Sequence, residues 1–162
     1  MARAPSNRSD VTKRGILNVA RSHFSSVGFE GTSTRRIAKE AGINHSLIVY
    51  HFKNKDGLWK AVMEDLFAAV GAHTEENAVS GDDPVETLRA SMHAFVSFCA
   101  QHPELHRIMT IEGRMKSDRL TWLLDTYLKE NLENVCTGIR AGQAQGRVRQ
   151  GNPAQLYYGA IG

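Results

Sequence analysis

Apolar residues recur at intervals of three and four along the chain, which is the spacing of one face of an α-helix. Ile16, Ala20 and Phe24 illustrate the pattern near the N-terminus, and Leu88 and Met92 repeat it in the middle of the chain. No stretch shows the sustained alternation of apolar and polar residues that is typical of a strand. The pattern therefore predicts an all-α fold.

Capping residues predict where the helices begin and end. Ser, Thr, Asn and Asp side chains can accept bonds from the free N–H groups of a first helical turn, and glycine favours a helix end. The strongest start is Asp83 followed by Pro84. The expected helices run from near residue 9 to Gly28, from 33 to 41, from 44 through 52, from 54 through at least 67, from 84 through at least 99, from 103 to about 112 and from 117 or 118 to 142 or 146, with another beginning at Asn152-Pro153.

Charge is distributed unevenly along the chain. Residues 1–60 hold 11 Lys and Arg against 4 Asp and Glu, whereas residues 61–162 hold 9 against 13. A basic front half points to a polyanionic partner for that part alone, although a solvated basic surface would give the same count. No apolar run is long enough to span a membrane, and the N-terminus lacks the apolar segment of a secretory signal. We therefore expect a cytoplasmic protein without a membrane partner.

The segment 32–55 has the layout of two short helices joined by a tight turn. Gly42 supplies the turn, which a Cβ would obstruct. Ile37, Ala38 and Ile48 suit the close approach of two inner helix faces, and the outer face of the second helix carries hydrogen-bonding groups. In a helix-turn-helix the second helix lies in the major groove while the first crosses the backbone. The segment therefore predicts DNA binding.

These residues resemble the TetR family of bacterial one-component transcription regulators. The resemblance covers about residues 10–62, and residues 63–162 match only in architecture. The chain departs from the family at Val49, where a tyrosine that contacts phosphate is usual, and Tyr50 is the alternative for that contact. The motifs that carry the resemblance are Gly28-Phe29, Thr32-Ser33-Thr34-Arg35-Arg36-Ile37-Ala38, Ala41-Gly42-Ile43, Tyr50-His51-Phe52 and Lys53-Asn54-Lys55.

The resemblance implies two domains. Residues 1–55 would form a three-helix DNA-binding domain with an N-terminal arm. Residues 56–162 would form an antiparallel helical domain for effector binding and dimerisation. We expect this second domain to be incomplete at the C-terminus, because the helix that begins at Asn152-Pro153 has only about two turns before Gly162.

Five residues are expected at the DNA backbone: Thr34, Arg35, Tyr50, His51 and Lys55. Thr34 and Arg35 begin the first helix of the pair, where the helix dipole favours phosphate. Lys55 begins the following helix, and the resemblance supports a phosphate contact there. His51 has an alternative interpretation as a histidine packed between helices.

Sequence recognition is expected from the exposed start of the second helix. His45 and Ser46 are the best candidates for contacts with base edges, and Leu47 could touch a thymine methyl group or belong to the core. Asn44, the expected cap, lies on the same DNA-binding surface. Arg36 either reaches a base edge or is solvated.

An effector pocket is also implied by the resemblance, within the helices expected between residues 84 and 142. The candidate lining is apolar and polarisable with a few polar groups, which suits a small hydrophobic or aromatic effector. The same side chains could instead form ordinary core. The candidates are Met92, Phe95, Phe98, Cys99, Met109, Trp122 and Tyr127.

Other chemistry has little support in the sequence. His102 and His106 have a spacing compatible with a metal site, but no third ligand is evident, so we expect no metal. Cys99 and Cys136 form no CxxC and are expected to be reduced thiols, with a disulfide as the alternative. No nucleophile elbow, Walker loop or dinucleotide fingerprint occurs, so we expect neither an enzyme nor a cofactor.

The sequence thus predicts a homodimeric regulator that binds double-stranded DNA at a pseudo-palindromic operator, acts as a repressor and is released by a small hydrophobic effector. The alternative is a cytosolic helical small-molecule-binding or adaptor protein without specific DNA binding. Salt-dependent binding to duplex DNA distinguishes the two.

Overall fold

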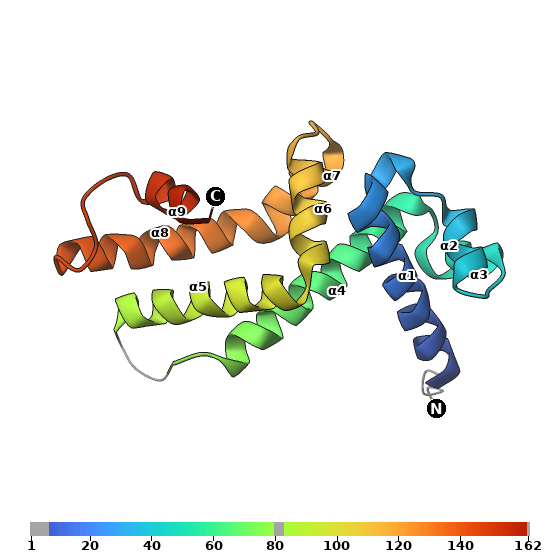
Figure 1. Cartoon of the computed structure of the whole chain (residues 1–162), viewed down its shortest axis with the longest axis horizontal. Helices are drawn as coiled ribbons and strands as arrows, with labels where there is room; N and C mark the ends of the chain where they lie inside the picture. The colour runs from blue at the N-terminus through green and yellow to red at the C-terminus, as the bar shows by residue number, and fades with distance from the viewer. Residues whose placement is uncertain (1–6, 80–82, 162) are drawn as a thin grey trace, which may run out of the picture. The chain divides into compact units, whose positions relative to one another are not determined.

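The computed structural model describes residues 7–79 and 83–161, and these ranges contain helices and loops but no strand. The predicted all-α fold is confirmed. Most of the predicted N-terminal arm, residues 80–82 and Gly162 lie outside the described residues. The helices (Figure 1) are α1 (Asn7–Gly31), α2 (Thr34–Glu40), α3 (His45–Phe52), α4 (Lys55–Glu76), α5 (Pro84–Gln101), α6 (Pro103–Gly113), α7 (Asp118–Leu123), η1 (Leu124–Leu128), α8 (Lys129–Ala144) and α9 (Pro153–Ile161).

The helices group into two compact units. The first unit comprises the chain up to Ala68 together with His102–Lys116, and the second comprises Ala69–Gln101 and the chain from Ser117 onward. The first unit therefore holds α1, α2, α3, α6 and the first part of α4, and the second holds the end of α4 with α5, α7, η1, α8 and α9. The domain boundary predicted at residue 55 divides the chain by expected function and does not coincide with the boundary between these packing units. It stays a prediction.

The core of the first unit is formed by one face of each helix. Ile16, Ala20 and Phe24 of α1 are fully buried, as their spacing predicts. Val27 lies three residues after Phe24, a spacing that predicts a buried position on this face, but it is 55% exposed, so that prediction is wrong. Gly28 directly after it has φ 69° and ψ −177°, which interrupts α1 as predicted.

Buried residues of α4 and α6 complete this core. Each large apolar side chain taken out of water contributes about 1.5–3 kcal/mol, so α4 alone provides a substantial part of the stability on which α2 and α3 rest. α6 packs against α1 in the same unit. The buried side chains of these two helices are Leu58, Trp59, Val62, Met63 and Leu66 of α4 and Leu105 and Ile108 of α6.

The second unit is built on α8, which packs against both α5 and α9 (Figure 1). The single long helix predicted from residue 118 to 142 is interrupted by the π-helical segment η1. A π turn bonds i to i+5 and shifts the register of the side chains that follow. Leu124, the first residue of this segment, is 38% exposed, whereas Leu123 directly before it is fully buried.

Asp83 caps α5 as predicted, because its Oδ1 accepts from the backbone N–H of Val85 at 2.9 Å. Its other oxygen accepts from Nη1 of Arg147 at 2.5 Å, and the second guanidinium nitrogen donates to Glu86 Oε1 at 2.8 Å. Arg147 follows α8, so this exposed cluster ties the start of α5 to the loop after α8.

Candidate nucleic-acid interface and ligand cavity

The turn between α2 and α3 has the geometry of a helix-turn-helix. Gly42 adopts φ 66°, a left-handed conformation that a residue with a Cβ enters only at a cost. The Ile43 N–H donates to the Ala38 carbonyl at 3.0 Å and closes the turn. Ile37 and Ile48 are almost completely buried, so the inner faces of the two helices meet as the sequence predicts.

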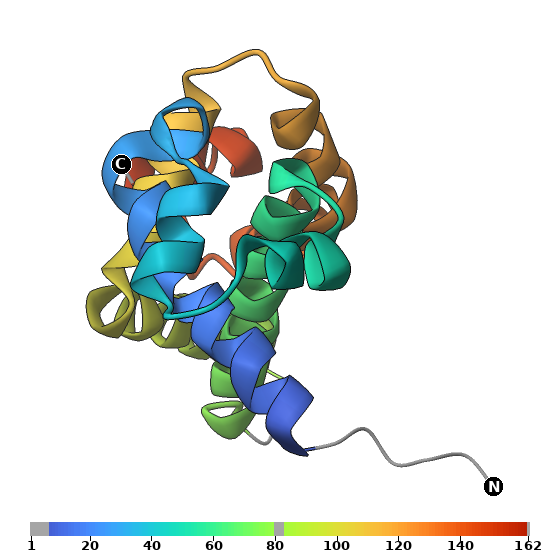
Figure 2. The same cartoon turned by 90° about the vertical axis from the view of Figure 1, so that its right-hand side faces the viewer.

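The outer face of α3 is open to solvent. Tyr50 is 79% exposed, Val49 48% and Leu47 37%, whereas Ile48 between them is buried. This exposure removes the core alternative for Leu47 and leaves it on the surface predicted to face DNA. Figure 2 shows the molecule from the side on which α2 and α3 lie.

The start of α3 is organised by Asn44. Its Oδ1 accepts from both the backbone N–H and the hydroxyl of Ser46, each at 2.9 Å. Asn44 is therefore the predicted cap, and its carboxamide N–H₂ group remains available at the surface. Arg35 and Arg36 on α2 are exposed, which is compatible with both alternatives for Arg36.

Thr34 and His45 meet across the two helices. The Thr34 hydroxyl lies 3.0 Å from Nε2 of His45, and both residues are partly buried. A residue expected at phosphate is thus bonded to a residue expected at a base edge. The sequence predicts each residue as a DNA contact but does not predict that they touch.

Lys55 is anchored at the start of α4. Its Nζ donates to the Glu30 carbonyl at 3.3 Å and lies 4.4 Å from the centre of the Phe29 ring. These contacts hold the ammonium group between the end of α1 and the start of α4. His51 is partly buried and meets the Tyr50 ring edge-on, with ring centres 5.0 Å apart, so both of its alternatives remain.

Two side-chain contacts that brace this domain were missed from the sequence. His23 of α1 lies 2.8 Å from the Glu40 carboxylate at the end of α2, and Arg21 of α1 pairs with Asp65 of α4. Both pairs join residues that are far apart in sequence, so no local pattern announces them. They fix α1 against the helices on either side of α3.

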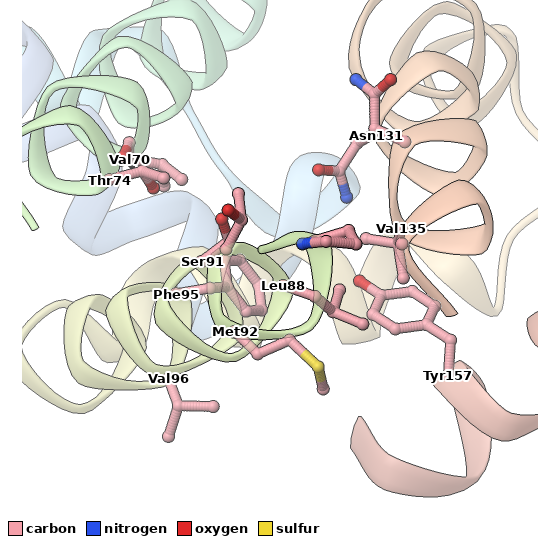
Figure 3. A pocket seen from close by; sticks show the side chains of 14 residues that line it. Val70, Thr74, Leu88, Ser91, Met92, Phe95, Val96, Asn131, Val135 and Tyr157 are labelled. Carbon is pink, nitrogen blue, oxygen red and sulfur yellow. Dashed lines mark hydrogen bonds between the residues drawn. The ribbon is translucent and has the colours of Figure 1, made fainter. Parts of the chain in front are cut away.

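The second unit contains a cavity of about 440 Å³ lined by residues of α4, α5, α8 and α9. Val70 and Thr74 come from α4, Met92 and Phe95 from α5, and Tyr157 reaches in from α9 (Figure 3). Burial raises the pKa of the Tyr157 phenol, and the neighbouring Tyr158 adds to this rise. The hydroxyl is therefore uncharged at neutral pH.

Only part of the predicted pocket lining reaches this cavity. Met92 and Phe95 do, whereas Phe98 is buried beside the His73 ring. The remaining candidates do not line it. Cys99 is partly buried, and burial raises the pKa of its thiol. Trp122 and Tyr127 meet edge-on with ring centres 5.6 Å apart, and Met109 lies on α6 in the first unit. Sequence reasoning missed the residues of α8 and α9 that complete the cavity.

The described residues include no group of three or more His, Cys, Asp or Glu side chains placed to hold a metal ion. Among the helices that the structure describes, none combines the length and the apolar character that crossing a bilayer requires.

Comparisons with known proteins agree with the helix-turn-helix geometry. The family model described as "Bacterial regulatory proteins, tetR family" matches residues 16–62. The protein named "Probable HTH-type transcriptional regulator YttP" of Bacillus subtilis (strain 168) is 31% identical over 136 residues, which cover 83% of this chain and 66% of that protein. The HTH-type transcriptional repressor NicS of Pseudomonas putida is 28% identical over 144 residues, covering 88% and 68%.

Solved structures share the fold. The crystal structure of HlyIIR, a hemolysin II transcriptional regulator, superposes with a TM-score of 0.79 at 24% identity and covers 94% of this chain and 84% of that one. The chain spans about two thirds of the length of the curated relatives it matches. The family match lies on the helices that form the helix-turn-helix and its supports. The chain belongs to the tetR family of bacterial regulatory proteins.

Proposed function

We propose that this protein is a ligand-responsive, DNA-binding transcription regulator of the cytoplasm that acts as a repressor and is not an enzyme. The observation that carries the proposal is the α2–α3 pair, whose inner face is buried and whose outer face presents hydrogen-bonding side chains to solvent. A helix exposed in this way can enter a major groove while the helix before it crosses the backbone.

Contacts with DNA divide into two kinds. His45, Ser46 and Leu47 at the start of α3 read base edges, with Asn44 and Arg36 beside them. The residues that position the helix on the phosphates are Thr34, Arg35, Tyr50, His51 and Lys55. The positive balance of residues 1–60 supports this division, because backbone contacts depend on cationic groups.

The active form is a homodimer. One helix-turn-helix contacts too few bases for specific affinity, whereas two related by a two-fold axis bind a pseudo-palindrome with half-sites about one helical turn apart. Residues 56–162 provide dimerisation and effector binding. Analytical ultracentrifugation of the full-length protein at micromolar concentration tests this, and a monomer under those conditions contradicts it.

α4 connects effector binding with DNA binding in this proposal. The helix begins at Lys55, and Val70 and Thr74 near its other end line the cavity. We take α4 to have two alternative placements. A ligand that binds the protein more tightly in one placement shifts the equilibrium towards it, and DNA affinity falls if that placement suits DNA less well.

The test is fluorescence anisotropy with random duplex DNA at two salt concentrations. The proposal expects binding that weakens steeply as salt rises, because bound phosphates release counterions. A small-molecule carrier without DNA-binding function predicts no such binding. Absence of salt-dependent duplex binding by the intact dimer therefore contradicts the proposal.

A further inference from the structure

Among the residues that the structure describes, the lining of the cavity in the second unit carries no formal charge. None of its 14 lining residues is Asp, Glu, Lys, Arg or His. Its volume of about 440 Å³ falls within the range of small-molecule sites in proteins. We propose that this cavity binds an electrically neutral, amphipathic molecule whose polar end is held by carboxamide and hydroxyl groups; this rests on the proposed function, in which the cavity is the effector site.

One wall of the cavity is apolar. Leu88, Met92 and Phe95 of α5 form most of this wall, and Val135 of α8 adds an apolar group from the neighbouring helix (Figure 3). A thioether and an aromatic ring adapt to flat or irregular apolar groups. This wall therefore packs the hydrocarbon part of a ligand.

The lining also carries polar groups, most of which come from α8, α5 and α9. Asn131 and Asn134 on α8 contribute two carboxamides, Ser91 on α5 a hydroxyl and Tyr157 on α9 a phenol. Within the described part of the chain, the side chains of Ser91 and Asn134 bond to no other residue. A carboxamide donates and accepts, so these groups match an amide, an alcohol or a ketone.

A charged ligand group finds no counter-charge in this lining. Moving a carboxylate or an ammonium group from water into the cavity costs hydration free energy, which the neutral amide and hydroxyl groups of the lining restore less fully than an opposite charge would. Arg89 and His93, also on α5, line a neighbouring hollow rather than this cavity. The ring of His73 on α4 is tilted by 56° against the Phe98 ring, and His73 is likewise absent from the lining. The cavity therefore selects against both ion types.

Three isosteric probes test the charge preference: 2-naphthamide, 2-naphthoate and the 2-naphthamidinium cation. They share one ring system and differ in the charge of a planar polar end. We expect calorimetry on the full chain at neutral pH to give at least about tenfold tighter binding of the amide than of either ion. Equal or tighter binding of an ion contradicts the proposal, and so does absence of amide binding at millimolar concentration.

Variants locate the preference in the lining. Asn131→Asp and Asn134→Asp add a negative charge with little change of shape at exposed positions of α8. Each should weaken amide binding and strengthen amidinium binding by about tenfold, a reversal that misfolding would not produce. Gln155→Glu on the exposed side of α9, outside the lining, adds the same charge and should change neither affinity. An unchanged order of probes in both α8 variants overturns the assignment.

A failure of the cavity assignment can be distinguished from a failure of the proposed function. Probe affinity is measured without DNA, and duplex binding is measured without probe. Neutral-ligand selectivity in a protein that does not bind duplex DNA leaves the cavity assignment intact and removes the regulator proposal. Duplex binding by a protein whose cavity prefers an ion supports the regulator proposal and overturns the assignment of a neutral ligand.

Discussion

Thr34 of α2 and His45 of α3 are joined by a hydrogen bond of 3.0 Å between the hydroxyl and Nε2. The bond occupies Nε2 whichever atom supplies the proton, and it leaves Nδ1 as the ring nitrogen that can face a base. It also fixes the ring rotation of the first residue of α3. Thr34 therefore positions His45 in addition to its own expected contact with phosphate.

Thr34→Val should relax sequence preference, because the isosteric side chain cannot hold the His45 ring. A well-placed contact to a base edge discriminates by about 1–3 kcal/mol, so the ratio of affinities between preferred and altered operators should fall by about fivefold or more. Competition anisotropy with duplexes altered one base pair at a time measures this ratio. Thr34→Ser keeps the hydroxyl and should retain the preference; identical behaviour of the Val and Ser variants would rule the positioning role out.

Lys55→Ala should weaken binding to all duplexes to a similar degree. A phosphate contact carries no sequence information, and its loss should reduce the slope of log affinity against log salt by about one unit. Anisotropy over a series of salt concentrations measures the slope. Lys129→Ala removes the same charge from α8 in the acidic part of the chain and should leave the slope unchanged. If Lys55→Ala binds like the wild type at every salt concentration, the proposed docking of α4 on the backbone is wrong.

Gly57→Ala should destabilise the start of α4. A Cβ at this position would overlap the Phe52 carbonyl oxygen, so the junction between α3 and α4 would have to move, at a cost of about 1–3 kcal/mol. Gly71 is on the same helix with nothing within 4 Å of the place that a Cβ would take, and Gly71→Ala should instead stabilise by about 0.5–1 kcal/mol. Urea denaturation followed by circular dichroism compares the two free energies of unfolding. Equal effects of the two substitutions would contradict the close approach at Gly57.

Asp83 should make the stability of the protein depend on acid pH. The hydrogen bond from Arg147 holds the pKa of this exposed carboxyl below its ordinary value of 3.8. Because the pKa is lowered by folding, the contribution is complete above 3.8 and is lost as the pH falls through the lowered value. Asp83→Asn keeps a good helix cap but removes the charge.

Thermal unfolding by circular dichroism should place the Tm of Asp83→Asn about one or two degrees below that of the wild type at neutral pH. The difference should close at strongly acid pH, where both side chains are uncharged. Arg147→Gln serves as the control for the partner and should lower the Tm in the same pH range. If the difference in Tm between the wild type and Asp83→Asn persists unchanged in strong acid, the ion pair is not the source of that difference.

Much of the fold follows from local signals in the sequence. Asn44 and Asp83 cap the helices that they were predicted to cap, and Gly28 and Gly42 turn the chain with positive φ angles. Caps and turns are decided by bonds between residues a few positions apart, so a linear pattern contains them. The helix-turn-helix is therefore visible before any tertiary contact is known. The π segment η1 changes the register that periodicity assumes constant, so the stripe expected from residue 118 onward does not continue unbroken.

The sequence by itself determined the helical class, the caps that begin α3 and α5, and the surface expected to face DNA. Only the tertiary structure decided that Thr34 meets His45, that Lys55 rests on Phe29, and which side chains line the cavity. Met92 and Phe95 share a helix face that periodicity predicts, but Asn131 and Tyr157 join them from helices far along the chain. A cavity is the space left when several helices pack, and its lining depends on contacts between residues that no local spacing relates.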